Sequence, residues 1–248
     1  MPDDRQQSPD AVDAAPPGTA GSVSRRRLLS AAAGDAVCAR PTPPTTALPA
    51  GADDSATRRL AVGVGPQGAT TVEFRGRIAQ TGASGDLFTS YGYLTRATHA
   101  RTAHLFHGTP HNQSSALLTA YATGNLSARI LDQSVHELDI VGTLTVFQRK
   151  YPGAHFNDPA SFKVGKPVAR FDLRLQDILA VYAQGKGIPT LTGDMRQTAA
   201  HRLAGGLAGH RFGHKGLRLR MFATGLGTLT DPVTLNAELE IAGNWSVE

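Results

Sequence analysis

Eight long stretches of alternating polar and apolar residues constrain the fold of this chain more than any other feature. Each stretch runs for ten residues or more, and Gly, Pro, Asn or Asp residues separate it from the next. Alternation with a period of two indicates half-buried β-strands, because successive side chains of a strand point to opposite faces. We predict strands at residues 70–80, 87–98, 114–131, 135–149, 167–184, 188–202, 215–230 and 234–246.

This succession of strands favours a closed sheet. Eight long strands joined in sequence leave two unpaired edges unless the last pairs with the first, and closure removes both edges. Glycines inside the strands, such as Gly92 and Gly142, fit this arrangement, since Gly in a strand commonly marks a bulge or bend. The predicted fold is all-β, an eight-stranded antiparallel closed β-barrel formed by residues 61–248. A barrel of this size is filled by side chains or holds one small ligand.

Residues 1–60 differ in composition from the rest of the chain. They are rich in Asp, Ala, Pro, Thr and Ser, and such a segment buries too little apolar surface to fold, so we predict a disordered tail. The stretch from Ser24 to Leu29, SRRRLL, resembles a twin-arginine export signal, and 50–52 (AGA) offers a cleavage site. Asp35 interrupts the short apolar stretch that follows. Two localisations stay open: export by the twin-arginine route, or the cytoplasm if the segment does not function.

Composition argues against several classes of function. No run of about 18 apolar residues is present, so no membrane span is expected. The net charge is +5, but the arginines are spread singly along strands, which is typical of a solvated surface and does not predict nucleic-acid binding. The single cysteine, Cys38, lies in the tail, which excludes a disulfide framework. No phosphate-binding Gly loop, dinucleotide fingerprint or nucleophile elbow occurs, and we expect no cofactor.

Several segments resemble the allene oxide cyclase barrel-like family, in its bacterial branch, which is related to allene oxide cyclases and dirigent proteins. They are VEFRGR (72–77), GDLFTSYGYLTRA (85–97), the segment 139–179 that contains RFDLRLQDIL, GIPTLTGDMRQT (187–198) and GLRLRMFATGLGTLTDP (216–232). Together they span most of residues 70–245.

The resemblance implies a calycin-type barrel and a function. The function would be that of a cofactor-independent cyclase or isomerase, which folds a small hydrophobic, polyketide- or lipid-like substrate in the barrel cavity and directs its stereoselective cyclisation. The alternative is a non-catalytic small-molecule-binding or dirigent-like secreted barrel. Related barrels form dimers or trimers, so a homo-oligomer is also implied.

The resemblance also implies one catalytic residue, Glu73, and the strand pattern adds two further candidates. Glu73 matches a glutamate whose carboxylate stabilises a developing cation in the plant cyclases, and Arg75 stands where those enzymes have Asn. If this face points into the barrel, Glu73 is a charge stabiliser or general base and Arg75 holds an acidic oxygen of the substrate. If it points outward, both are solvated, which is the usual place for charges. Tyr91 is a third catalytic candidate, as a hydrogen-bond donor.

Other aromatic residues are candidate contacts for the substrate. Tyr93 shares a strand face with Tyr91, and Tyr121 lies in the next strand. These tyrosines either donate a hydrogen bond in the cavity or pack with their hydroxyls at the rim. Phe222, on the same strand face as Arg218 and Arg220, completes this set of candidates.

The stretch HARTAHLFHGTPH, residues 99–111, connects the second and third predicted strands. Four histidines fall in it, but Gly108 and Pro110 break any helix that could present two of them together, and no acidic residue lies between residues 87 and 131. We therefore expect no metal site. Leu105 and Phe106 are predicted to turn inward as a lid at the barrel mouth, with His104 or His107 facing an entering ligand.

Overall fold

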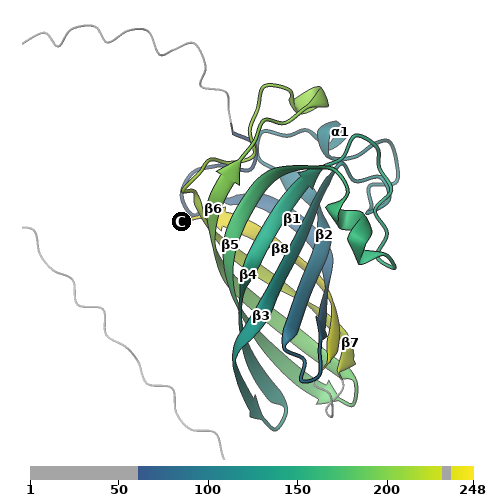
Figure 1. The fold of residues 1–248 in the computed structure, drawn as a ribbon, viewed down its shortest axis with the longest axis vertical. Helices are drawn as coiled ribbons and strands as arrows, with labels where there is room; N and C mark the ends of the chain where they lie inside the picture. The colour runs from purple at the N-terminus through teal and green to yellow at the C-terminus, as the bar shows by residue number, and fades with distance from the viewer. Residues whose placement is uncertain (1–60, 231–235) are drawn as a thin grey trace, which may run out of the picture. The chain divides into compact units, whose positions relative to one another are not determined.

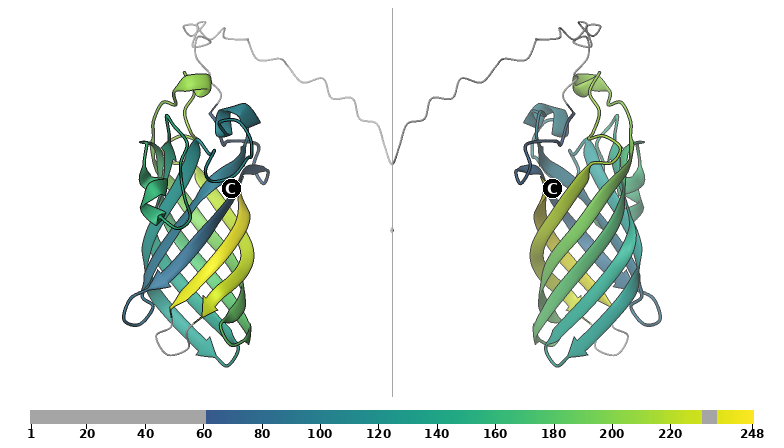
Figure 2. Two further views of the ribbon diagram at one scale, coloured as in Figure 1. Left: turned by 90° about the vertical axis from the view of Figure 1, so that its right-hand side faces the viewer. Right: turned by 90° about the vertical axis from the view of Figure 1, so that its left-hand side faces the viewer.

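The computed structural model describes residues 61–230 and 236–248, and it confirms the closed eight-stranded antiparallel barrel. Each strand pairs with its neighbours in sequence, and the last pairs with the first (Figure 1). The strands are β1 (Thr70–Thr81), β2 (Leu87–Ala97), β3 (Leu118–Asp132), β4 (Val135–Gln148), β5 (Lys166–Ala183), β6 (Lys186–Ala200), β7 (Arg218–Thr230) and β8 (Ala237–Val247). The predicted tail, with its twin-arginine segment, lies outside the described residues. Both views in Figure 2 show tilted strands forming a continuous wall, as barrel closure requires.

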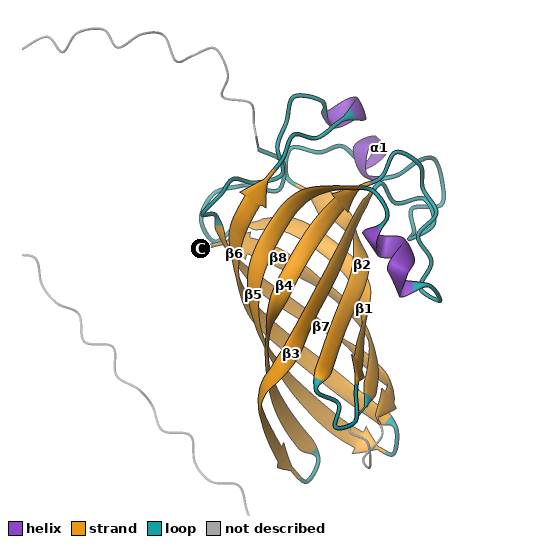
Figure 3. Ribbon diagram, in the orientation of Figure 1, coloured by secondary structure: helices purple, strands orange, loops and turns teal. Residues whose placement is uncertain are grey.

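All long connections lie at one end of the barrel, which we call the loop end (Figure 3). They are residues 98–117 between β2 and β3, 149–165 between β4 and β5, and 201–217 between β6 and β7. They carry one turn of helix, α1 (Thr102–Leu105), and two 3-10 turns, η1 (Pro159–Lys163) and η2 (Gly205–Leu207). The short connections 82–86, 133–134 and 184–185 lie at the opposite end, the hairpin end. No helix within the described ranges is long and apolar enough to cross a membrane.

The predicted alternation sorts side chains between the barrel interior and its outer wall. On β5, Phe171, Leu173 and Leu175 are buried, whereas Arg170, Asp172 and Arg174 are exposed. The loop end of the interior is filled by aromatic rings: the centroid of the Trp245 ring lies 5.9 Å from that of Phe74, 5.8 Å from Phe171 and 6.3 Å from Phe212. The core is therefore the inside of the barrel.

Gly92 and Gly142 permit close backbone approach and do not mark bulges, whereas Gly227 lies at a register shift in the β7–β8 pair. A Cβ atom on Gly92 would lie 2.2 Å from the carbonyl oxygen of Arg75, and one on Gly142 would lie 2.2 Å from that of Thr123. The register shift in the β1–β2 pair falls elsewhere, between Glu73 and Phe74. A side chain at these two glycines cannot fit without a shift of the neighbouring strand.

Candidate functional site: an aromatic and arginine-lined groove on the outer wall

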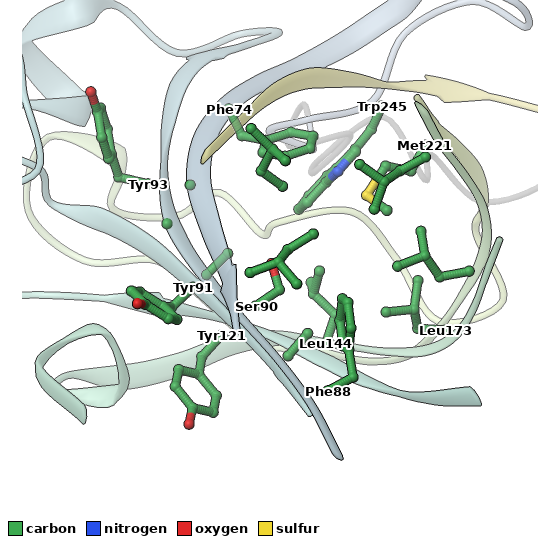
Figure 4. A pocket seen from close by; sticks show the side chains of 18 residues that line it. Phe74, Phe88, Ser90, Tyr91, Tyr93, Tyr121, Leu144, Leu173, Met221 and Trp245 are labelled. Atoms are coloured by element: carbon green, nitrogen blue, oxygen red, sulfur yellow. The ribbon is translucent and has the colours of Figure 1, made fainter. Parts of the chain in front are cut away.

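The interior of the barrel is almost filled. Its cavity has a volume of about 30 Å³, which holds roughly one or two water molecules. The side chains that point into it are nearly all apolar, and Phe74, Phe88, Leu144, Leu173, Met221 and Trp245 are seen in Figure 4. Small-molecule sites usually enclose about 300–1,000 Å³. In this structure the interior therefore does not enclose a ligand of that size.

The three candidate tyrosines lie on the outer wall of the barrel. Tyr91, Tyr93 and Tyr121 border the cavity, but their rings point away from it in Figure 4. They are not left in solvent, because the connection between β4 and β5 packs against this part of the wall. The ring of Tyr91 lies 5.4 Å from that of Phe162 and 6.2 Å from that of Phe156. These residues form a second, smaller apolar cluster outside the barrel.

Hydrogen bonds hold the β4–β5 connection against the wall. The buried guanidinium of Arg149 donates to the carbonyl oxygens of Tyr151 (3.1 Å) and Ser161, and burial lowers its pKa. Thr119 on β3 donates its hydroxyl to the carbonyl of Phe162 at 2.8 Å. Buried polar groups must find such partners, so these bonds specify one path for the chain.

A turn in the same connection presents Phe156. The backbone amide of Asp158 donates to the carbonyl of His155 at 2.9 Å, which closes a turn with Phe156 at its second position. The Asp158 side chain then accepts from the amide of Ala160 (3.1 Å) and caps η1, where Pro159 suits the first position. The sequence HFNDP thus places an aromatic side chain on the wall beside Tyr91 and Tyr93.

The histidine-rich connection joins β2 to β3 as predicted, and it packs beside Tyr93. Leu105 and Phe106 are both buried, with the Phe106 ring 6.1 Å from Tyr93 and 4.9 Å from His111. The Asn112 side chain accepts hydrogen bonds from both the amide and the hydroxyl of Ser114. This local turn delays the start of β3 by four residues relative to the prediction, to Leu118. His107 is exposed.

Beside these two connections a groove runs across the outer wall over β1, β8 and β7. Cross-strand pairing places Arg75 between Tyr93 of β2 and Ala242 of β8, and it places Arg77 between Tyr91 and Glu240. Ala242 has a small side chain and forms part of the floor of the groove. Residues of the two connections, such as Phe156 and Asn112, form one of its sides. The groove has a volume of about 410 Å³. Its lining comprises Arg75, Gly76, Arg77, Tyr93, His111, Asn112, Gln113, Phe156, Thr224, Gly225, Leu226, Glu240, Ile241 and Ala242.

The two arginines in the groove differ in their partners. Arg77 donates to Glu240 at 2.6 Å, and its guanidinium carbon lies 4.9 Å from the centre of the Phe156 ring. Arg75 is exposed and forms no ion pair within residues 61–230 and 236–248. The Tyr93 hydroxyl likewise has no hydrogen-bond partner in the described part of the chain. Burial raises the pKa of Tyr91, and the positive charge of Arg77 opposes this in part.

Of the predicted site residues, only Arg75 and Tyr93 line the groove, and Glu73, His107 and Phe222 lie apart from it. Glu73 faces outward and accepts a hydrogen bond from Arg96 at 3.0 Å, so it does not line the interior cavity. Phe222 lies on the outer wall of β7 with 45% of its surface exposed, and His107 lies at the loop end. By contrast, Arg75, Tyr93 and Phe106 are neighbours, with Tyr91 and Tyr121 beside them.

A second hollow on the outer wall has a different character. It has a volume of about 510 Å³ and spans β3 to β7. No aromatic side chain lines it, and its charges include the ion pair of Arg220 with Asp194 at 3.3 Å. Small-molecule sites favour aromatic and apolar linings with few polar groups. The groove beside Tyr93 and Phe156 fits that description better.

Asp177 is a buried titratable group that the sequence interpretation missed. It is 3% exposed, its Oδ1 atom has no partner among the described residues, and burial raises its pKa to about 7 despite an opposing backbone hydrogen bond from Thr190. The signal was available in the alternation, because Asp177 follows Leu173 and Leu175 in the interior register. It does not line the interior cavity.

Neither a metal site nor a comparison with known proteins assigns a function to this chain. Within the described ranges, no group of three or more His, Cys, Asp or Glu side chains is placed to hold a metal ion. The chain matches no known protein-family model, no curated protein and no solved structure. The resemblance to the allene oxide cyclase barrel-like family, the cyclisation and the homo-oligomer that it implies stay predictions.

Proposed function

We propose that this protein is a small-molecule-binding barrel whose binding site is the groove on the outer wall, with Phe156 and Tyr93 contacting an aromatic or apolar part of the ligand. The observation that carries the proposal is the groove itself. At about 410 Å³ it has the size of a small-molecule site. The strand pairing of β1, β2, β7 and β8 fixes its floor, and hydrogen-bonded connections hold one of its sides.

This proposal corresponds to the alternative in which the barrel binds a small molecule and does not catalyse its conversion. The interior cavity of about 30 Å³ is too small for a polyketide- or lipid-like molecule in this structure. Cyclisation inside the barrel would therefore need the interior side chains to move apart. The groove requires no such change, because its volume is already open.

Ligand titration followed by NMR tests the proposal. We would titrate isotope-labelled protein with a neutral aromatic probe, 2-naphthylacetamide, and follow the backbone amide shifts. We expect the largest shifts at residues that line the groove, such as Tyr93 and Ala242. Replacing Phe156 by Ala should weaken binding severalfold, because the ring loses its stacking partner. Phe222→Ala is the matched control, since it removes an exposed ring from the wall outside the groove.

Two results would overturn this assignment. Shifts concentrated at Leu173 and Met221 would move the site into the barrel interior. The absence of saturable binding at millimolar probe would remove the groove as a site for aromatic molecules.

A further inference from the structure

The groove carries an excess of unpaired hydrogen-bond donors and of positive charge. Glu240 is its one carboxylate, and Arg77 already engages it at 2.6 Å. Arg75 is the second arginine of the lining and has no carboxylate partner among the described residues. Among the charged side chains that line the groove, the positive charge of Arg75 is therefore not neutralised by a carboxylate.

The Tyr93 hydroxyl is a second donor on the same row of the wall. Arg75 and Tyr93 stand directly opposite each other in the β1–β2 register, so their Cβ atoms lie about 5 Å apart. Their polar groups can thus reach the same small group in the groove. A guanidinium and a phenol hydroxyl together match an acceptor-only group such as a carboxylate.

The aromatic side of the groove lies beside these donors. Tyr93 packs against Phe156 with ring centroids 6.3 Å apart, and Phe156 itself lies under the Arg77 guanidinium. A ligand that contacts Phe156 through a flat apolar body would hold its polar end within reach of Arg75. The apolar contacts supply affinity, and the charge selects among ligands of the same shape.

Resting on the proposed function, we infer that the ligand of this groove is an aromatic acid whose carboxylate is bound by Arg75 and Tyr93. Arg77 is a positioning residue in this arrangement, because Glu240 holds its charge and Phe156 lies against its guanidinium. The acid form of a ligand should bind more tightly than a neutral form of the same shape.

A matched pair of probes tests this inference. We would measure dissociation constants for 2-naphthylacetate and 2-naphthylacetamide, which differ in charge but hardly in shape. For the unmodified protein at low salt we expect the acid to bind on the order of fivefold more tightly, the size typical of a partly exposed ion pair. The advantage should shrink as salt rises, because both charges are solvent-accessible.

Substitutions assign the effect to a residue. Arg75→Gln should abolish the preference for the acid, because the ion pair is lost, and it should change the affinity for the amide less than the affinity for the acid. Arg174→Gln, which removes an exposed arginine from the other hollow, should change neither constant. Tyr93→Phe should reduce the preference for the acid and keep the ring contacts.

The outcomes separate this inference from the proposed function. Equal binding of both probes in the groove, or an acid preference that survives in Arg75→Gln, refutes the aromatic-acid inference and leaves the binding site standing. Failure of both probes to shift any groove residue refutes both.

Discussion

The guanidinium carbon of Arg77 lies 4.9 Å from the centre of the Phe156 ring while the same side chain donates a 2.6 Å hydrogen bond to Glu240. The contact joins β1, β8 and the β4–β5 connection, which are far apart in the sequence. Cation–π contacts at such partly exposed sites contribute about 0.5–1 kcal/mol, and exposed ion pairs contribute about as much or less. The arrangement therefore matters more for where Phe156 lies than for the stability of the barrel.

Replacing Arg77 by Met should loosen the β4–β5 connection without unfolding the barrel. The aliphatic part of the side chain is retained, but the charge over Phe156 is lost. We expect faster limited proteolysis within residues 151–158 and a free energy of unfolding that falls by no more than about 1 kcal/mol. Arg170→Met, on the outer wall of β5, should not change the cleavage rate. An unchanged cleavage rate in Arg77→Met would show that the hydrogen bonds of Arg149 and Thr119 alone hold the connection.

Asp177 should make the stability of the protein depend on pH. Its pKa is about 7 in the folded protein and about 4 in an unfolded chain, so between these values the folded state binds more protons. The free energy of unfolding should therefore fall as pH rises from about 4 to 7, by up to about 4 kcal/mol, and then level off. The physical cause is the cost of a carboxylate charge among apolar interior side chains.

Urea denaturation at pH 5 and pH 8 measures this effect. Asp177→Asn keeps the shape of the side chain but cannot ionise, so its stability should differ less between the two pH values. Asp172→Asn removes an exposed carboxyl from the same strand and should keep the original pH dependence. If Asp177→Asn and the unmodified protein responded identically to pH, another group would be responsible.

Gly92 should tolerate no side chain. The Cβ atom of an alanine there would lie 2.2 Å from the carbonyl oxygen of Arg75 and 2.7 Å from the Cα atom of Gly76. Because both neighbours are backbone, the strands would have to separate, and we expect a loss on the order of 3 kcal/mol in the free energy of unfolding. Thr89→Ala on the same strand should cost less than about 1 kcal/mol. A thermal melt distinguishes the two, and a Gly92→Ala midpoint equal to that of Thr89→Ala would disprove the close approach.

The single tryptophan of the chain reports on the interior. Trp245 is 1% exposed and packs against Phe74, Phe171 and Phe212, so its fluorescence should be blue-shifted and poorly quenched by acrylamide. Phe74→Leu removes ring atoms beside it and should increase quenching, because the cavity left behind is only partly refilled. Phe222→Leu, on the outer wall, should leave quenching unchanged. Strong quenching in the unmodified protein would mean that the loop end of the interior is open.

The alternation by itself determined the strands, their order and the closure of the barrel. In the stretch RFDLRLQ, the period of two already separates Phe171 and Leu173 from Arg170 and Asp172. That pattern depends only on the geometry of a strand, in which neighbouring side chains point to opposite faces. Burial of Asp177 follows from the same register and could have been predicted.

The candidate site could not be predicted in the same way. Tyr91 and Tyr93 lie on the outer wall, yet both are buried, because the β4–β5 connection covers Tyr91 and both connections pack against Tyr93. Phe156 reaches Arg77 only because the β4–β5 connection packs across β2 and β3, and Glu240 reaches Arg77 only because barrel closure brings β8 beside β1. Sequence periodicity indicates which side of a strand a residue occupies. Contacts between segments more than sixty residues apart depend instead on how the connections pack on the barrel. The groove results from that tertiary packing and could not be read from the periodicity.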